Sequence, residues 1–160
     1  MLTDDRNPLD ARVRYDAFIS YRSATSRRAA RKLQRALVAL SKRHRREHPI
    51  NLFLDTQSLV VGGLDDTIKA ALEQSRTLIV LLARGTRDSP WVSVEIEHWL
   101  QHGGSLDRLF LVRHDPGLDL DWSATTQNFA HADDLPEALS NRFPQEQKWL
   151  DLSSSAFGTD

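Results

Sequence analysis

The sequence contains no cysteine, and this absence excludes several kinds of chemistry. Disulfide bonds, thiolate metal sites and cysteine nucleophiles are all ruled out. An apolar run of 18 or more residues is also missing, so the sequence predicts no membrane-spanning helix. The first ten residues, MLTDDRNPLD, are acidic, whereas a secretory signal peptide begins with basic residues before an apolar stretch. We therefore expect a soluble, unprocessed protein in the cytoplasm, with no membrane partner.

Several familiar catalytic motifs are absent as well. The chain has no phosphate loop of the P-loop or GxGxxG type, its spacing places no Ser-His-Asp set, and no carboxylate pair marks a glycosidase. An apolar fraction of 40% in 160 residues supports one core and one domain. We expect a flexible leader at residues 1–12, a domain at 13–153, and a tail at 154–160 that leads to a further region in the natural protein.

Charge is distributed unevenly, although the net charge is only -1. Nine of the 21 Lys and Arg residues fall between positions 27 and 46, and acidic residues dominate after position 115. Surfaces of opposite sign on one small domain favour self-association or a docking partner. The basic segment could also bind nucleic acid, but it has few aromatic residues to stack on bases, which makes a solvated basic face the more usual explanation.

Apolar periodicity predicts alternating strands and helices. Short runs rich in β-forming residues predict strands at residues 15–21, 50–54, 77–83, 109–112 and 149–152. Helical spacing predicts helices at residues 27–47, 66–75 and 90–103. Residues 115–147 are poorly periodic and should form loops and short helices. This alternation predicts an α/β fold with a central parallel sheet and helices on both faces.

In such a sheet, ligands bind beyond the carboxyl ends of the strands, where residues 21–26, 55–64 and 83–95 should lie. In the helix predicted at 90–103, Trp91, Glu95 and the two histidines at 98 and 102 form one stripe. The neighbouring stripe is apolar and should face the core. Glu95 is therefore expected beside the core at the edge of the crevice.

Glu97 lies on the same predicted helix but should face solvent, as most helical Glu residues do. His98 and His102 stand four residues apart, a spacing that can bind a metal but that more often belongs to surface residues. The sequence therefore predicts no metal site. Spacing alone leaves the function open.

Three segments in order resemble a known family. YDAFISYRS, LFLDTQSLVVGGLDDTIKAALEQSR and SPWVSVEIEHW are similar to parts of TIR (Toll/interleukin-1 receptor homology) domains of the bacterial NAD-cleaving type. The first resembles the family's first strand and the loop after it. The second resembles the next strand, the BB loop and a helix, and the third resembles the motif in which Trp precedes the catalytic Glu by four residues. The resemblance implies a flavodoxin-like three-layer fold with about five parallel strands.

The resemblance also implies roles for individual residues. Glu95 would be the catalytic carboxylate. Substrate-binding residues would be Trp91, Tyr21, Arg22, Ser23, Asp55 and Leu59. The BB loop, which gates the pocket and takes part in assembly, would contain Ser58, Val60, Val61, Gly62, Gly63 and Leu64. Two positions depart from some active relatives, which carry a second basic residue at Ser23 and an aromatic residue at Leu64.

A TIR domain of this type would cleave NAD⁺ to nicotinamide and ADP-ribose, or to a cyclic variant. NAD⁺ would be the substrate, with no cofactor and no metal, and other TIR domains would be partners in an activating assembly. The expected setting is bacterial immune or stress signalling, including antiviral defence. One carboxylate is enough, because nicotinamide leaves as a neutral base and only the oxocarbenium-like ribose needs stabilisation. The alternative is a non-catalytic TIR adaptor, which does not require Glu95 and Trp91.

Overall fold

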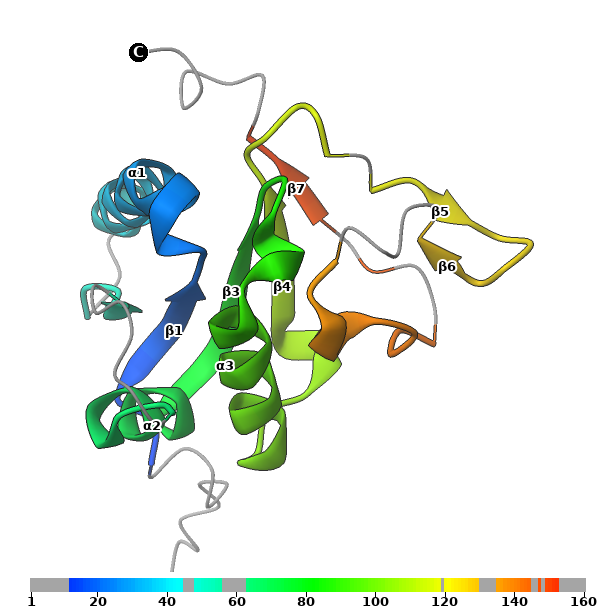
Figure 1. The fold of residues 1–160 in the computed structure, drawn as a ribbon. Helices are drawn as coiled ribbons and strands as arrows, with labels where there is room; N and C mark the ends of the chain where they lie inside the picture. Colours follow the sequence, from blue (N-terminus) through cyan, green and yellow to red (C-terminus); the bar gives the residue numbers. More distant parts are fainter. Residues whose placement is uncertain are drawn as a thin grey trace, which may run out of the picture.

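A five-stranded parallel sheet forms the centre of the molecule (Figure 1). The computed structural model describes residues 12–44, 48–55, 63–118, 120–129, 135–144, 147 and 149–152, except for the side chains of 23–25. The strand order is β2-β1-β3-β4-β7. The bounds are β1 (Tyr15–Ser20), β2 (Leu52–Leu54), β3 (Ser75–Leu82), β4 (Leu109–Arg113) and β7 (Trp149–Asp151). This order is that of flavodoxin-like folds and confirms the predicted fold class.

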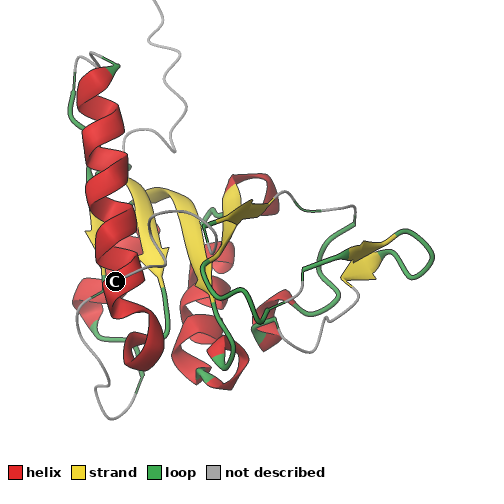
Figure 2. Cartoon of the chain, turned by 90° about the horizontal axis from the view of Figure 1, so that it is seen from above, coloured by secondary structure: helices red, strands yellow, loops and turns green. Residues whose placement is uncertain are grey.

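Helices cover both faces of the sheet (Figures 1 and 2). Helix α1 (Ser23–Arg43) packs on one face, and α2 (Asp66–Glu73) and α3 (Pro90–Gln101) pack on the other. In the part of the chain that the structure describes, the connections contain the short 3-10 helices η1 (Thr86–Asp88), η2 (Leu106–Arg108) and η4 (Glu137–Leu139). No helix among the described residues is long and apolar enough to cross a membrane.

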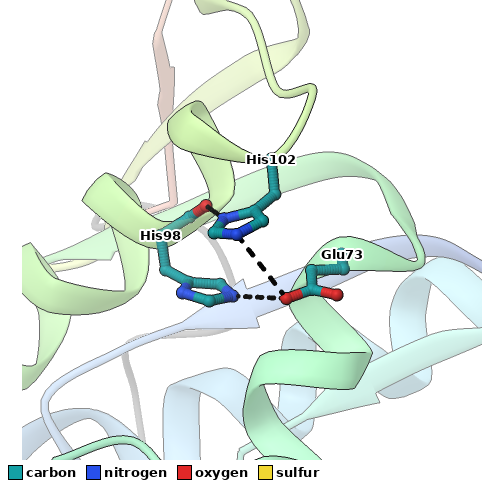
Figure 3. Close-up of side chains that lie close together, drawn as sticks. All are labelled: Glu73, His98 and His102. Carbon is teal, nitrogen blue, oxygen red and sulfur yellow. Dashed lines mark hydrogen bonds and ion pairs between the residues drawn. The ribbon is translucent and has the colours of Figure 1, made fainter.

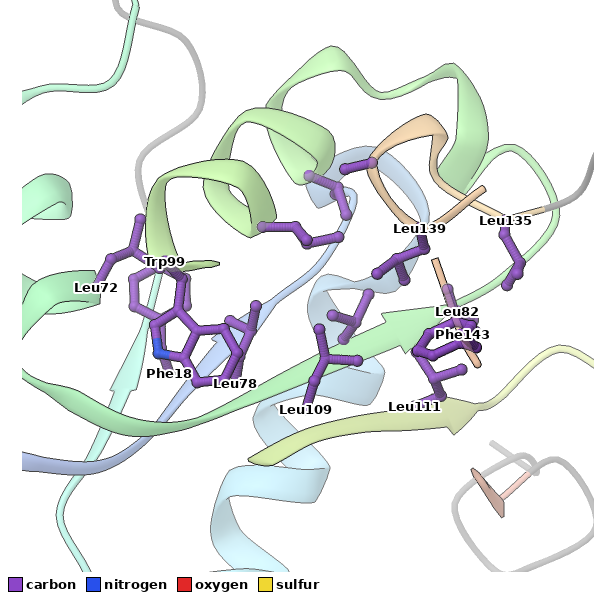
Figure 4. Close-up of a cluster of buried hydrophobic side chains, with 14 of the residues drawn as sticks. Phe18, Leu72, Leu78, Leu82, Trp99, Leu109, Leu111, Leu135, Leu139 and Phe143 are labelled. Atoms are coloured by element: carbon purple, nitrogen blue, oxygen red, sulfur yellow. The ribbon is translucent and has the colours of Figure 1, made fainter. Parts of the chain in front are cut away.

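The sheet separates two hydrophobic cores, because successive strand residues point to opposite faces. The larger core lies under α2 and α3 and is partly drawn in Figure 4, where Trp99 and Leu72 pack against Phe18 and Leu78. The smaller core lies under α1 and contains Ile19. This alternation decides the geometry of the site, since it puts consecutive residues at the end of β1 on different faces.

Two local predictions need correction. The first helix begins at Ser23 rather than at 27. The short polar residues at 23–26 were expected to form a loop. They instead add a turn to the N-terminus of the helix, whose packing is provided by the apolar residues that follow. Residues 115–147 include a hairpin of β5 (Trp122–Ser123) and β6 (Asn128–Phe129), which periodicity missed because each strand has two residues.

Helix termini follow the sequence signals in part. Asp65 caps α2 as predicted, because its carboxylate accepts a hydrogen bond of 3.0 Å from the backbone N–H of Ile68. Ser89 occupies the N-cap position of α3, and Pro90 follows it as predicted. The Ser89 side chain makes no capping hydrogen bond to the described residues.

Candidate active site

The site lies where the strand order reverses, between the carboxyl ends of β1 and β3. Arg22 follows β1 and Gly85 follows β3. The Arg22 guanidinium spans the two ends, with Nη1 donating a 2.9 Å hydrogen bond to the carbonyl oxygen of Gly85. Gly85 has φ 84°, and a Cβ atom there would lie 2.2 Å from Arg22 Nη1. The turn therefore requires glycine.

Glu95 is buried on α3 beside this junction, with 3% of its surface exposed. The hydroxyl of Ser20, the last residue of β1, donates a 2.5 Å hydrogen bond to Glu95 Oε2. Burial raises the pKa of Glu95 well above its usual value of 4.5; the bond from Ser20 opposes this shift, and the negative charge of Asp55 adds to it. The surroundings of Glu95 therefore favour its neutral form more than water does.

Glu97 differs from Glu95 in its surroundings, although the two residues lie on the same helix. Its side chain is 36% exposed and forms an ion pair with Arg142, which is 42% exposed. This contrast matches the helical stripes predicted from the sequence. Glu95 is a buried carboxyl group beside the core, and Glu97 is a surface carboxylate.

Asp55 and Tyr21 lie near the same end of the sheet. Asp55 directly follows β2, and its charge raises the pKa of both Glu95 and Tyr21. Burial is the larger cause of the raised pKa of Tyr21, and the charge of Arg27 acts against it. The hydroxyl group of Tyr21 is buried. Tyr21 packs in the core under α1, so the sheet separates it from the face that carries Glu95.

The remaining predicted site residues fall into two groups. Trp91 is half-buried in the first turn of α3, on the same side as Glu95 because the two residues are four apart. Gly63 has φ 126°, and the half-buried Leu64 packs against the larger core. The side chain of Ser23 and the loop residues Ser58, Leu59, Val60, Val61 and Gly62 lie outside the described part of the chain. Their roles remain predictions.

Three features of this edge were missed from the sequence. Ser20 carries a detectable signal, because alternation along β1 places it on the face of Phe18, where a polar residue needs a partner. The electrostatic effect of Asp55 on Glu95 was not predicted from the sequence. His114, just after β4, lies with its Nε2 2.8 Å from the hydroxyl of Ser26, and burial lowers the pKa of His114.

Comparison with known proteins identifies the family. Residues 18–115, more than half of the chain, match the family model described as Thoeris protein ThsB, TIR-like domain. The chain belongs to this TIR-like domain family. The family resemblance read from the three sequence motifs is thereby confirmed.

Two relatives show how far the likeness of this TIR-like domain extends. It is 38% identical over 141 residues to the NAD(+) hydrolase ApTIR of Actinoplanes sp. (strain ATCC 31044 / CBS 674.73 / SE50/110). The match covers 88% of this chain but spans only 19% of the length of that relative. The TIR domains of the activated Roq1 resistosome recognising the effector XopQ share the fold, with a TM-score of 0.52 and 23% identity over 71% of this chain and 64% of that one.

Proposed function

We propose that this TIR-like domain hydrolyses NAD⁺ at the nicotinamide-ribose bond, with Glu95 as the catalytic carboxylate. The observation that carries the proposal is the burial of Glu95 at the switch point, where Ser20 holds one of its oxygens. A buried acid with a perturbed pKa costs stability and is typical of an active site. A non-catalytic adaptor has no use for it. The likeness to a protein named as an NAD(+) hydrolase supports the choice of substrate.

The proposed reaction needs one carboxylate. The bond between ribose C1′ and the nicotinamide nitrogen breaks, and its electron pair leaves with nicotinamide, which becomes neutral without gaining a proton. A water oxygen then bonds to C1′, and the water proton passes to Glu95, giving ADP-ribose. A nucleophile within the same substrate molecule would replace water in the cyclic variant. The Glu95 anion stabilises the positive charge on the ribose in the transition state.

The raised pKa of Glu95 suits this role. The nicotinamide of NAD⁺ is a cation, and a positive charge nearby favours the ionised carboxylate. Substrate binding is therefore expected to drive the proton off Glu95 at the moment when the anion is needed. Glu95 is only 3% exposed, so it lies in surroundings of lower dielectric constant than the surface, and its attraction to the substrate cation is stronger there.

Arg22 is the residue that we propose for the pyrophosphate of NAD⁺. It lies at the switch point, where flavodoxin-like folds bind phosphorylated ligands. One of its N–H groups is held by the carbonyl oxygen of Gly85, which fixes the position of the guanidinium. A guanidinium carries five N–H donors, and its planar fork matches phosphate oxygens.

We further propose that self-assembly activates the domain. An apolar groove of about 380 Å³ runs between α1, β4 and β7, and two of its lining residues, Phe110 and Leu150, are 50% and 55% exposed. Exposed apolar surface of this kind marks an interaction site. Helix α1, which contributes Leu33 and Leu37 to the groove, is rich in basic residues, and the chain is rich in acidic residues after position 115, so a second copy of the domain supplies complementary charge. The setting we propose is bacterial immune or stress signalling in the cytoplasm.

The test is to incubate concentrated protein with NAD⁺ and to separate the products by chromatography. We expect nicotinamide and ADP-ribose in equal amounts, or nicotinamide with a cyclic product of the same stoichiometry. Folded protein that releases no nicotinamide at any concentration would contradict hydrolysis and leave the adaptor as the better account.

A further inference from the structure

The C-terminal half of α3 carries a second group of ionisable side chains (Figure 3). His98 and His102 meet Glu73, the last residue of α2, and the possible ligand atoms of all three lie within 4.8 Å of one another. His98 is 15% exposed, His102 is 43% exposed and Glu73 is 44% exposed. The group is therefore reachable from solvent, and it joins two helices that pack on the same face of the sheet.

The distances in this group suit a small divalent ion. Nε2 of His98 lies 2.9 Å from Glu73 Oε1, and Nε2 of His102 lies 3.8 Å from the same oxygen. In a tetrahedral zinc site with Zn–N and Zn–O bonds of about 2.0–2.2 Å, neighbouring ligand atoms are about 3.3–3.5 Å apart. The two observed distances lie on either side of this range. Small side-chain rotations would bring all three atoms around one ion.

The ring of His102 is oriented by a hydrogen bond from its other nitrogen. Nδ1 of His102 lies 2.7 Å from the backbone carbonyl oxygen of His98. A carbonyl oxygen only accepts, so Nδ1 must carry hydrogen and donate it. Metal-binding histidines are usually oriented in this way, by a hydrogen bond from the nitrogen that does not bind the ion.

This arrangement turns the possible ligand atoms toward one another. Nε2 of His102, the ring nitrogen that does not meet the backbone carbonyl, is turned toward the carboxylate of Glu73. The imidazole rings of His98 and His102 also stack, with centroids 4.0 Å apart and planes 22° apart.

We propose that Glu73, His98 and His102 bind one divalent transition metal ion of the zinc class, with water completing the coordination. Two imidazoles and one carboxylate suit zinc and its neighbours, whereas magnesium and calcium prefer oxygen ligands throughout. This proposal departs from the sequence-based expectation that the histidines are surface residues without a metal. The ion cross-links α2 to α3, the helix that carries Glu95, and it does not take part in the proposed hydrolysis.

The experiment titrates chelator-treated, full-length protein with Co²⁺ and then Zn²⁺ in the absence of NAD⁺, so its result does not depend on catalysis. Visible absorption of Co²⁺ reports the coordination geometry, and calorimetry with Zn²⁺ gives affinity and stoichiometry. We expect saturable binding of one ion per chain, displacement of Co²⁺ by Zn²⁺, and a higher Tm for the metal-bound protein.

Variants locate the ion. Removing a hydrogen-bond partner of a metal ligand typically weakens metal binding about 10- to 100-fold. The variants His98→Ala/His102→Ala and Glu73→Gln remove ligands themselves, so each should weaken binding by more than this. The exposed His102→Ala variant tests the site with the least risk to folding. His44→Ala/His48→Ala removes another exposed pair with the same spacing and should bind the ion as the unaltered protein does. Absence of saturable binding would overturn the proposal, as would unchanged binding in His98→Ala/His102→Ala or loss of binding in the His44/His48 control.

Discussion

Replacing Glu95 with Gln should stabilise the protein at neutral pH while removing its catalytic group. The pKa of Glu95 is raised in the folded protein, mainly by burial, above the value of 4.5 that applies when the chain is unfolded. Between these two pKa values the folded protein binds one more proton at this position than the unfolded chain does. The free energy of unfolding therefore falls by about 1.4 kcal/mol for each pH unit in this window. Gln does not titrate, and its carbonyl oxygen can still accept the hydrogen bond from Ser20.

The assay is thermal unfolding of the two proteins from pH 4.5 to 7.5 without NAD⁺. The Tm of Glu95→Gln minus that of the unaltered protein should increase by about 3–5 °C per pH unit and level off once the pH passes the pKa of folded Glu95. Glu97→Gln is the matched control on the same helix. Its ion pair with Arg142 is partly exposed, so the change should stay within about 1 kcal/mol and should not increase with pH. A Glu95→Gln difference that is constant over this range, or a variant less stable at pH 7.5, would refute the reasoning.

Three further predictions follow from the site and from the apolar groove. Ser20→Ala removes a hydrogen bond that lowers the pKa of Glu95. The pH at which kcat/KM for NAD⁺ is half-maximal should therefore rise. An unchanged pH profile would show that this bond does not act on catalysis. Gly85→Ala should lower the free energy of unfolding by about 1–2 kcal/mol, because residue 85 has a left-handed backbone conformation, and an unfolding experiment measures this loss. The added Cβ should also displace Arg22 and raise the KM for NAD⁺, which initial-rate measurements report. Phe110 is half exposed, so Phe110→Asp should leave the Tm unchanged. The variant should not assemble, as light scattering would show, and its activity per subunit at high concentration should fall to that of dilute protein. Full activity in a monomeric variant would argue against activation by assembly.

The sheet and the position of Glu95 could be predicted because their signals are local. The run at β3 is continuously apolar and the helix at α3 repeats its apolar residues at helical spacing, so both elements were found to within a few residues. The stripe that carries Glu95 beside the apolar face follows from the same geometry. The sequence alone therefore distinguishes Glu95 from Glu97.

Contacts between distant segments could not be predicted in the same way. Ser20 and Glu95 are 75 residues apart, and Glu73 is 25 residues from His98, so each pair forms only when the sheet brings its helices and strand ends together. Asp55 approaches Glu95 because β2 lies beside β1, a neighbour relation that composition and spacing do not contain. Local patterns fix which face a residue takes, and the topology of the sheet fixes what it meets there.

The most direct test of the central claim is the rate of nicotinamide release per subunit by concentrated protein, compared among the unaltered chain, Glu95→Gln and Glu97→Gln. All three proteins should be shown to be folded under the assay conditions. The account predicts similar rates for the unaltered chain and Glu97→Gln, and a rate about 10²–10⁴-fold lower for Glu95→Gln, the range typical of losing a catalytic acid or base. A Glu95→Gln variant that releases nicotinamide at the rate of the unaltered protein would contradict the account.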